Sequence, residues 1–192
     1  EAARARMRRV AEHVRADSRA VRLTDPDVFL AEPYDFDQDQ LAQVLEDMEA
    51  NQEYSDIVTP TDEHAGKGYL HSEMLLTSQY ATMMLRTKAD DAPFLIAETV
   101  RDHSRIYPQA VAVHFFEVEP FNQKAADVMK AVEALKDDPA YSDLKFFETS
   151  NGVVHMFSDR YANEQFLRER AGFAEVGWVN KQELRRYGRI RA

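Results

Sequence analysis

An internal repeat constrains the fold of this chain more than any other feature of its sequence. The nine residues AEHVRADSR, from Ala11, lie over AETVRDHSR, from Ala97, at an offset of 86 residues. Six of the nine positions are identical, and they include Arg15 with Arg101 and Ser18 with Ser104. Repeats of this kind are sought first, because a duplicated unit changes how every other segment is interpreted.

Further matches follow in the same order along the chain, with two shifts of one residue. At an offset of 87 the matched strings are Glu32-Pro33-Tyr34 with Glu119-Pro120-Phe121, and Tyr54-Ser55-Asp56-Ile57 with Tyr141-Ser142-Asp143-Leu144. The offset then returns to 86, where Ser72-Glu73 lies over Ser158-Asp159. The unit is too long for a solenoid repeat, so the series indicates two copies of a small domain.

Both copies show the same order of predicted elements, α-β-α-β-β-α. Apolar periodicity predicts a first helix (6–16 and 94–102), a strand (28–30 and 111–118), an amphipathic helix (41–48 and 128–135), a hairpin and a final helix. We expect the proline of each Glu-Pro pair to close the first strand, and Ser72 and Ser158 to cap the final helices.

This order predicts an α+β fold with an internal duplication and a pseudo-twofold relation between the copies. Each unit contains β-α-β-β-α, which is most of a split-βαβ, ferredoxin-like unit. We expect repeat unit 1 at residues 1–90, repeat unit 2 at 91–175, and an extra strand with a basic helical tail at 176–192.

Composition excludes several kinds of chemistry. The 192 residues include no cysteine, which excludes disulfides, thiolate metal sites and cysteine-ligated clusters. A net charge of −10 argues against nucleic acid or anionic lipid as the main partner. No apolar run approaches the length of a membrane span, so we expect a soluble, cytoplasmic protein without membrane insertion.

The charge is unevenly distributed along the chain. Residues 1–24 carry seven arginines and three acids, and residues 181–192 carry five basic groups and one acid. Between Leu23 and Gly66 there are thirteen acids and no lysine or arginine. Basic ends around an acidic body suit docking to partners with complementary charge, and Arg8, Arg9, Arg185 and Arg186 are the candidate partner-binding residues.

Few residues are spaced as a catalytic or metal site requires. Asp35, Asp37, Asp39 and Glu46 approximate the carboxylate spacing of a calcium loop, but Gln40 stands where that loop needs glycine, which favours an acidic helix start. The six histidines lack zinc-motif spacing, and no nucleophile elbow or phosphate loop is present. We therefore predict no metal, no cofactor and no catalytic residue.

Two duplicated motifs remain as candidate sites. Glu32 and Glu119 are matched acids before proline, where acid–base chemistry competes with the simpler interpretation of an exposed turn. The Tyr-Ser-Asp triplets, with Tyr54, Asp56, Tyr141 and Asp143, are either a paired recognition surface or a repeated turn in which tyrosine packs and Ser and Asp bond the backbone. We favour the turn, because a repeated fold needs repeated turns.

Three strings carry a family resemblance: LTDPDVFLAEPYDFDQDQL, NQEYSDI and YLHSEMLLTSQYA. They resemble the YdhW-type family, small accessory proteins of bacterial oxidoreductase systems that contain iron–sulfur subunits and a tungsten- or molybdenum-pterin subunit. The similarity extends from about Val14 to Arg170. It implies an accessory role in a redox complex whose metals are held by other chains, and it assigns no catalytic residue.

The resulting hypothesis is a non-catalytic accessory or structural subunit that docks onto a larger oxidoreductase complex through protein contacts. The alternative is a regulatory module that binds a small molecule in the cleft between the two repeats. An unrecognised enzyme that uses Glu32 or Glu119 is the third possibility.

Overall fold

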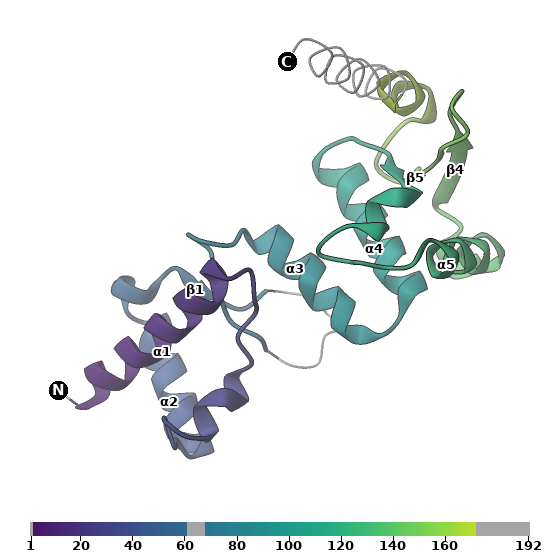
Figure 1. Ribbon diagram of the computed structural model, residues 1–192. Coiled ribbons are helices and arrows are strands. Elements are labelled where there is room, and N and C mark those ends of the chain that lie inside the picture. Colours follow the sequence, from purple (N-terminus) through teal and green to yellow (C-terminus); the bar gives the residue numbers. More distant parts are fainter. Residues whose placement is uncertain (1, 61–67, 172–192) are drawn as a thin grey trace, which may run out of the picture. The chain divides into compact units, whose positions relative to one another are not determined.

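The computed structural model describes residues 2–60 and 68–171. The chain divides into two compact units, Glu1–Asp90 and Asp91–Ala192, which we call unit 1 and unit 2 (Figure 1). Helices and short strands are present in both units, which confirms the mixed α and β character. The tail predicted at 176–192 lies outside the described residues.

Unit 1 consists mainly of helices around one short hairpin. Its elements are α1 (Ala2–Arg19), η1 (Pro26–Leu30), α2 (Gln38–Glu49), η2 (Gln52–Tyr54), β1 (Ile57–Val58), β2 (His71–Ser72), α3 (Ser78–Arg86) and η3 (Thr87–Ala89). Strands β1 and β2 are antiparallel, with Ile57 opposite Ser72. An isolated bridge between Thr24 and Leu70 extends this pairing.

Unit 2 repeats the same order with longer strands. Its elements are α4 (Ala92–Ile106), β3 (Val111–Ala112), η4 (Val113–Glu117), α5 (Ala125–Asp137), η5 (Pro139–Tyr141), β4 (Leu144–Glu148) and β5 (Val154–Ser158). The sheet order is β3-β5-β4, and β5 is antiparallel to both neighbours. Strands β3 and β4 therefore run parallel on either side of β5, as in a split-βαβ unit; the ferredoxin-like relation stays a prediction.

The first strand predicted in each copy is wrong over most of its length. Residues 28–30 lie in the 3₁₀ helix η1, and of 111–118 only Val111 and Ala112 form a strand before η4 begins. In unit 1 the Asp25 carboxylate accepts a bond from the Asp27 N–H, and Pro26 starts the turn with its fixed φ. In unit 1 local capping thus outweighs the apolar pattern, whereas η4 starts after Ala112 without a side-chain cap. The following Glu32-Pro33 and Glu119-Pro120 bonds are both cis.

The prediction that Ser72 and Ser158 cap the final helices is also wrong. Both residues are strand ends, in β2 and β5, and both are fully buried. Thr77 caps α3 through the Tyr80 N–H, and Asn163 bonds the Gln165 N–H where the last described helical segment of unit 2 starts. The two serines have another role, in a polar network between elements.

Each unit has its own buried apolar residues. In unit 1 one cluster joins the inner face of α1 to η1, α2 and the hairpin, and its buried members are Met7, Val10, Ala11, Val14, Phe29, Phe36, Leu41, Val44, Met48, Tyr54 and Leu70. In unit 2, α4 packs on α5 and on the sheet (Figure 1). Buried Val100, Val132, Leu135, Leu144 and Met156 occupy these elements.

The second helix of each unit begins differently. Asp37 caps α2 in a capping box, in which its carboxylate accepts the Gln40 N–H at 2.7 Å and the Gln40 side chain accepts the Asp37 N–H. Lys124 occupies the matched position before α5, with the same extended backbone and no side-chain cap. The acidic start predicted around Asp37 is thus a helix cap.

This difference predicts a stabilising substitution. Lys124→Asp should raise the free energy of unfolding of unit 2 by about 1 kcal/mol, because the new carboxylate caps α5 as Asp37 caps α2. Urea denaturation measures the effect. Asp37→Ala is the matched control and should lower stability by a similar amount; an unchanged or lower midpoint for Lys124→Asp would contradict this account of the cap.

Candidate functional site

A partly buried ion pair joins α1 to the turn before β1 in unit 1. Arg15, on α1, donates from Nε to Oδ2 of Asp56 at 3.0 Å and from a terminal nitrogen to Oδ1. The same guanidinium donates to the Glu53 carbonyl at 3.2 Å, so it also closes the η2 turn. The Asp56 side chain is 6% exposed and that of Arg15 is 30% exposed. This two-point geometry is the strong form of an arginine–carboxylate bond.

Two serines complete the network. The Ser72 hydroxyl donates to Oδ2 of Asp56 at 2.6 Å, and the Ser72 N–H donates to the Ser18 hydroxyl at 2.8 Å. Ser18 lies on α1, one turn from Arg15, and Ser72 lies at the end of β2. Three separate elements, α1, the η2 turn and β2, are therefore joined by polar contacts.

Unit 2 contains the same network at the matched positions. Arg101 donates from Nε to Oδ2 of Asp143 at 3.0 Å and also bonds Oδ1, and its terminal nitrogen reaches the Ala140 carbonyl at 3.2 Å. The Ser158 hydroxyl donates to Asp143 at 2.7 Å, and its N–H donates to the Ser104 hydroxyl at 2.9 Å. We call each set of four residues, Arg15-Ser18-Asp56-Ser72 and Arg101-Ser104-Asp143-Ser158, a network.

The networks keep their carboxylates ionised. Hydrogen bonding from Arg15 lowers the pKa of Asp56, with a further contribution from Ser72. Burial acts to raise the pKa of Asp143, but hydrogen bonds from Arg101 and Ser158 outweigh it and bring the pKa to about 2. Because the pKa of such a carboxyl is lower in the folded than in the unfolded chain, its ionised form stabilises the fold at pH values above the unfolded pKa of about 3.9. This stabilisation is lost as the pH falls toward 2.

The aspartates of the Tyr-Ser-Asp triplets are therefore members of the two networks. Tyr54 is buried and Tyr141 is half-buried under the Arg101 guanidinium, 5.3 Å from the ring centroid. Asp56 and Asp143 bond arginine and serine side chains rather than only the local backbone, which the sequence interpretation missed. The arginines and serines of the networks are matched residues of the repeat, as the two aspartates are. Their joint presence in both copies was the sequence signal that could have indicated the network.

The matched acids before proline lie on the surface. Glu32 and Glu119 are both exposed, and neither makes a hydrogen bond or ion pair with another residue that the structure describes. Arg9 lies near Glu32 but donates to the Pro33 carbonyl, so no acid–base pair with either glutamate is formed in the described residues.

Unit 1 carries a second polar chain that has no equivalent in unit 2. His13 bonds the Tyr34 hydroxyl through Nδ1 at 2.9 Å and lies 3.3 Å from an Asp17 oxygen through Nε2. Asp17 also accepts from Thr24 and Arg22. The matched residues in unit 2 are Thr99, His103 and Phe121, which cannot form this chain. It is thus a feature that one copy gained or the other lost.

The other histidines that the structure describes do not gather into a metal site. His71 is buried on β2 and His155 on β5, at positions that the repeat does not match. Across residues 2–60 and 68–171, no group of three or more His, Asp or Glu side chains is arranged to hold a metal ion. Nor does this part of the chain contain a helix with the length and apolarity to cross a bilayer.

Of the four candidate partner-binding arginines, two lie in the described residues. Arg8 is exposed on α1, 74% in its side chain, and pairs with Glu12 at 2.9 Å. Arg9 donates to the Pro33 carbonyl at 2.7 Å and lies over the Tyr34 ring at 4.8 Å, so it holds the turn before α2. Arg185 and Arg186 lie outside the described residues.

Comparison with known proteins assigns a family. The family model described as the YdhW C-terminal domain matches the chain twice, over residues 4–91 and 90–179. The chain belongs to this family. The two matches confirm the internal duplication and correspond to its two copies.

A curated relative has the same family name. The chain is 30% identical over 152 residues to "Uncharacterized protein YdhW" of Escherichia coli (strain K12), covering 79% of this chain and 70% of that protein. No solved structure matches the chain. The relative's printed name gives no activity. Membership of the YdhW family therefore shows that the two proteins are related but does not give a function.

The network predicts a large effect of a single substitution. Asp143→Ala should destabilise unit 2 by about 2 kcal/mol, because it leaves the half-buried Arg101 with Glu98 as its only carboxylate partner in the described residues and Ser158 without its acceptor. Asp159→Ala, which removes an exposed pair with Lys145, is the control and should cost less than about 1 kcal/mol. Equal losses from the two variants in urea denaturation would show that the network is not the stabilising feature.

Proposed function

We propose that this chain is a non-catalytic accessory subunit that docks onto a larger oxidoreductase complex in the cytoplasm. The observation that carries the proposal is the division of polar groups in the units. Arg, Asp and Ser side chains bond one another within the networks, whereas in unit 1 exposed arginines are grouped on α1 and exposed acids are grouped in residues 32–49. A unit of this kind presents charged surfaces to a partner.

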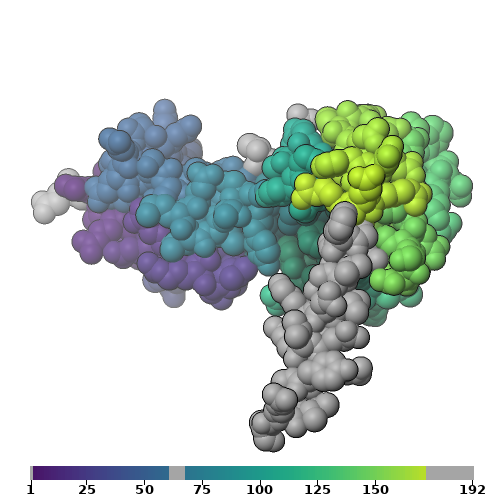
Figure 2. Space-filling model, turned by 90° about the horizontal axis from the view of Figure 1, so that it is seen from above, coloured from purple at the N-terminus to yellow at the C-terminus, as the bar shows by residue number. Residues whose placement is uncertain are grey.

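The basic surface in the described residues is the outer face of α1. Arg4, Arg6, Arg8 and Arg19 are all exposed there, and side chains of the purple N-terminal part of unit 1 lie on the surface in Figure 2. The acidic surface follows in the chain, where Glu32, Asp35, Asp37, Asp39, Glu46 and Glu49 are exposed. Separated charges of this kind steer association and fix the orientation of a complex.

The oxidoreductase partner is the part of the proposal that comes from the family resemblance. That resemblance implies that YdhW-type proteins accompany iron–sulfur and pterin-metal subunits. A chain without cysteine suits a supporting role in such a system better than electron transfer. The clusters and metals of the oxidoreductase would be held by other subunits.

Affinity purification from the native source tests the proposal. The wild-type chain should retain oxidoreductase subunits, and a variant with Arg8, Arg9, Arg185 and Arg186 changed to Glu should lose them by at least about tenfold, because the basic ends then repel an acidic partner. Partners are identified by mass.

Two single variants separate docking from misfolding. Because Arg9 also holds the Pro33 turn, Arg8→Glu is tested alone, with Lys130→Glu on the exposed side of α5 as the control of equal charge change. Reduced capture by Arg8→Glu and normal capture by Lys130→Glu would support docking through α1. Full capture by the four-residue variant would contradict the basic-end surface, and absence of oxidoreductase subunits from the wild-type capture would contradict the function.

A further inference from the structure

Unit 2 exposes large apolar side chains at the end of α4 and around η4. Ile106, Tyr107 and Val118 are 49%, 44% and 55% exposed, and Phe115 between them in sequence is half-buried. We call these four residues the unit 2 patch. Exposed apolar residues are ordinary when scattered singly, but a group of them marks an interaction surface.

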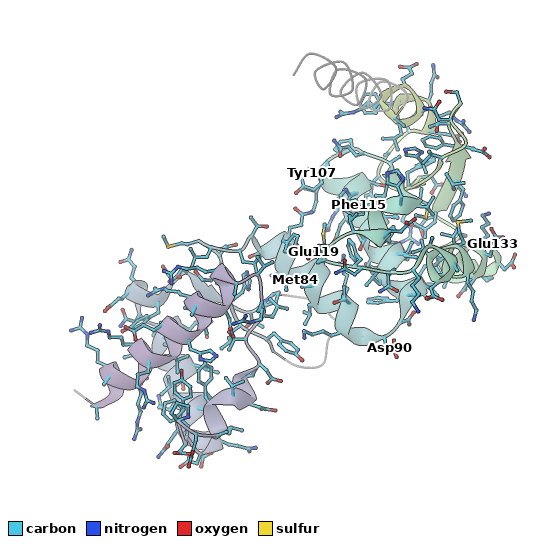
Figure 3. The ribbon with its side chains drawn as sticks, in the orientation of Figure 1. Met84, Asp90, Tyr107, Phe115, Glu119 and Glu133 are labelled. Atoms are coloured by element: carbon cyan, nitrogen blue, oxygen red, sulfur yellow. The ribbon has the colours of Figure 1, made fainter. Side chains whose placement is uncertain are left out.

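Ring contacts show that part of this patch is continuous. His103 lies 5.5 Å from the Tyr107 ring and 5.1 Å from the Phe115 ring, so it joins the two aromatic residues. Figure 3 labels Tyr107 and Phe115 close together in unit 2. Phe115 in turn contacts buried Phe121 at 5.5 Å, and the Phe121 N–H donates to the Val118 carbonyl. Burial lowers the pKa of His103, which keeps this joining residue uncharged at neutral pH.

The repeat provides an internal reference for these positions. Phe115 and Val118 stand where unit 1 has Val28 and Ala31, in the matched segments η4 and η1. Ile106 and Tyr107 follow Arg105 where Ala20 and Val21 follow Arg19, close to the one-residue insertion that changes the offset from 86 to 87. The fold therefore accommodates smaller apolar residues here, although Val21 and Val28 are exposed too, and packing within a unit does not require the larger ones.

Acidic side chains border the patch around Val118, whereas Arg105, next to Ile106, is paired with Asp102. Glu117 and Glu119 flank Val118, both are exposed, and neither forms an ion pair with a residue in the described part of the chain. Unit 1 has Leu30 at the position of Glu117, so this acid is also specific to unit 2. Two copies of the patch facing each other would bring these like charges together, which disfavours self-association.

We propose that the unit 2 patch binds a basic amphipathic helix of a partner protein. Apolar side chains of that helix pack between Ile106, Tyr107, Phe115 and Val118, and its lysines or arginines pair with Glu117 and Glu119. The proposal rests on the docking role proposed above and names the surface and the chemistry of one partner. It concerns a different unit from the α1 arginines.

A binding assay with synthetic peptides tests this inference on the full chain. One peptide forms an amphipathic helix with leucine on one face and lysine on the other, and its control has glutamate in place of lysine. The triple variant Ile106→Ala, Phe115→Val and Val118→Ala gives unit 2 the residues of unit 1. The Leu/Lys peptide should bind the wild-type chain and should bind the triple variant at least about tenfold more weakly, equivalent to about 1.4 kcal/mol.

The control in unit 1 is Val21→Ala with Val28→Ala, which removes exposed apolar groups elsewhere and should leave binding unchanged. The double variant Glu117→Gln and Glu119→Gln leaves the apolar residues intact. It should bind the Leu/Lys peptide more weakly, and its affinity should depend less on salt concentration. Equal binding by wild type and triple variant, or equal affinity for the Leu/Glu peptide, would overturn the proposal. Sedimentation velocity that shows a dimer lost in the triple variant would overturn it in favour of a second copy.

These outcomes are independent of the oxidoreductase capture. If charge reversal of the α1 arginines abolishes capture but no peptide binds the patch, only the proposed role of the patch is refuted. Peptide binding at the patch without oxidoreductase capture refutes the proposed complex and retains the helix-binding surface.

Discussion

The bond between a helix arginine and a turn aspartate is the interaction on which each unit depends. Arg15 and Arg101 each contact a carboxylate through two nitrogens and a backbone carbonyl through one of them. Each serine pair ties the same aspartate to a strand and the same helix. Because the strands of unit 1 have two residues each, apolar pairing across them is limited, and these polar contacts fix where the hairpin meets α1.

Such a network determines how the helix, turn and strand are arranged more than it raises the free energy of unfolding. Moving an arginine and an aspartate out of water costs free energy that their attraction offsets only in part, so a well-packed apolar replacement can be as stable. Removing one partner is costly, however, because the other is left uncompensated. A duplicated network therefore explains why four residues from three elements recur together in both copies, at offsets of 86 or 87.

The sequence alone was sufficient to predict the duplication, the α+β class and the helices around α2 and α5, because repeated strings and apolar periodicity act over short distances. It failed at η1 and η4, where Asp25 and Pro26 or a turn after Ala112 outweighed an apolar run. It failed again at Ser72 and Ser158, which resemble helix caps locally but bond an aspartate about 15 residues away in the chain. The network joins residues up to 54 positions apart, and no local pattern gives that contact.

Comparison of the two copies separates what the fold needs from what one copy has acquired. The Arg-Ser-Asp-Ser sets are the same in both, whereas the polar chain of His13, Tyr34 and Asp17 belongs to unit 1, and the unit 2 patch has larger apolar residues than the matched Ala20, Val21, Val28 and Ala31. We infer that the shared residues maintain the fold and that the unmatched residues make the surfaces of the two units different. The YdhW C-terminal domain thus occurs twice in one chain with one scaffold and two surfaces.

A double-mutant cycle on Arg101 and Asp143 tests the central claim most directly. The free energy of unfolding is measured for Arg101→Ala, Asp143→Ala and the double variant, and the coupling between the two side chains is calculated from the cycle. The account predicts a favourable coupling of at least about 1.5 kcal/mol, because the pair is largely buried and bonded at two points. A coupling below about 0.5 kcal/mol, as exposed ion pairs give, would contradict it.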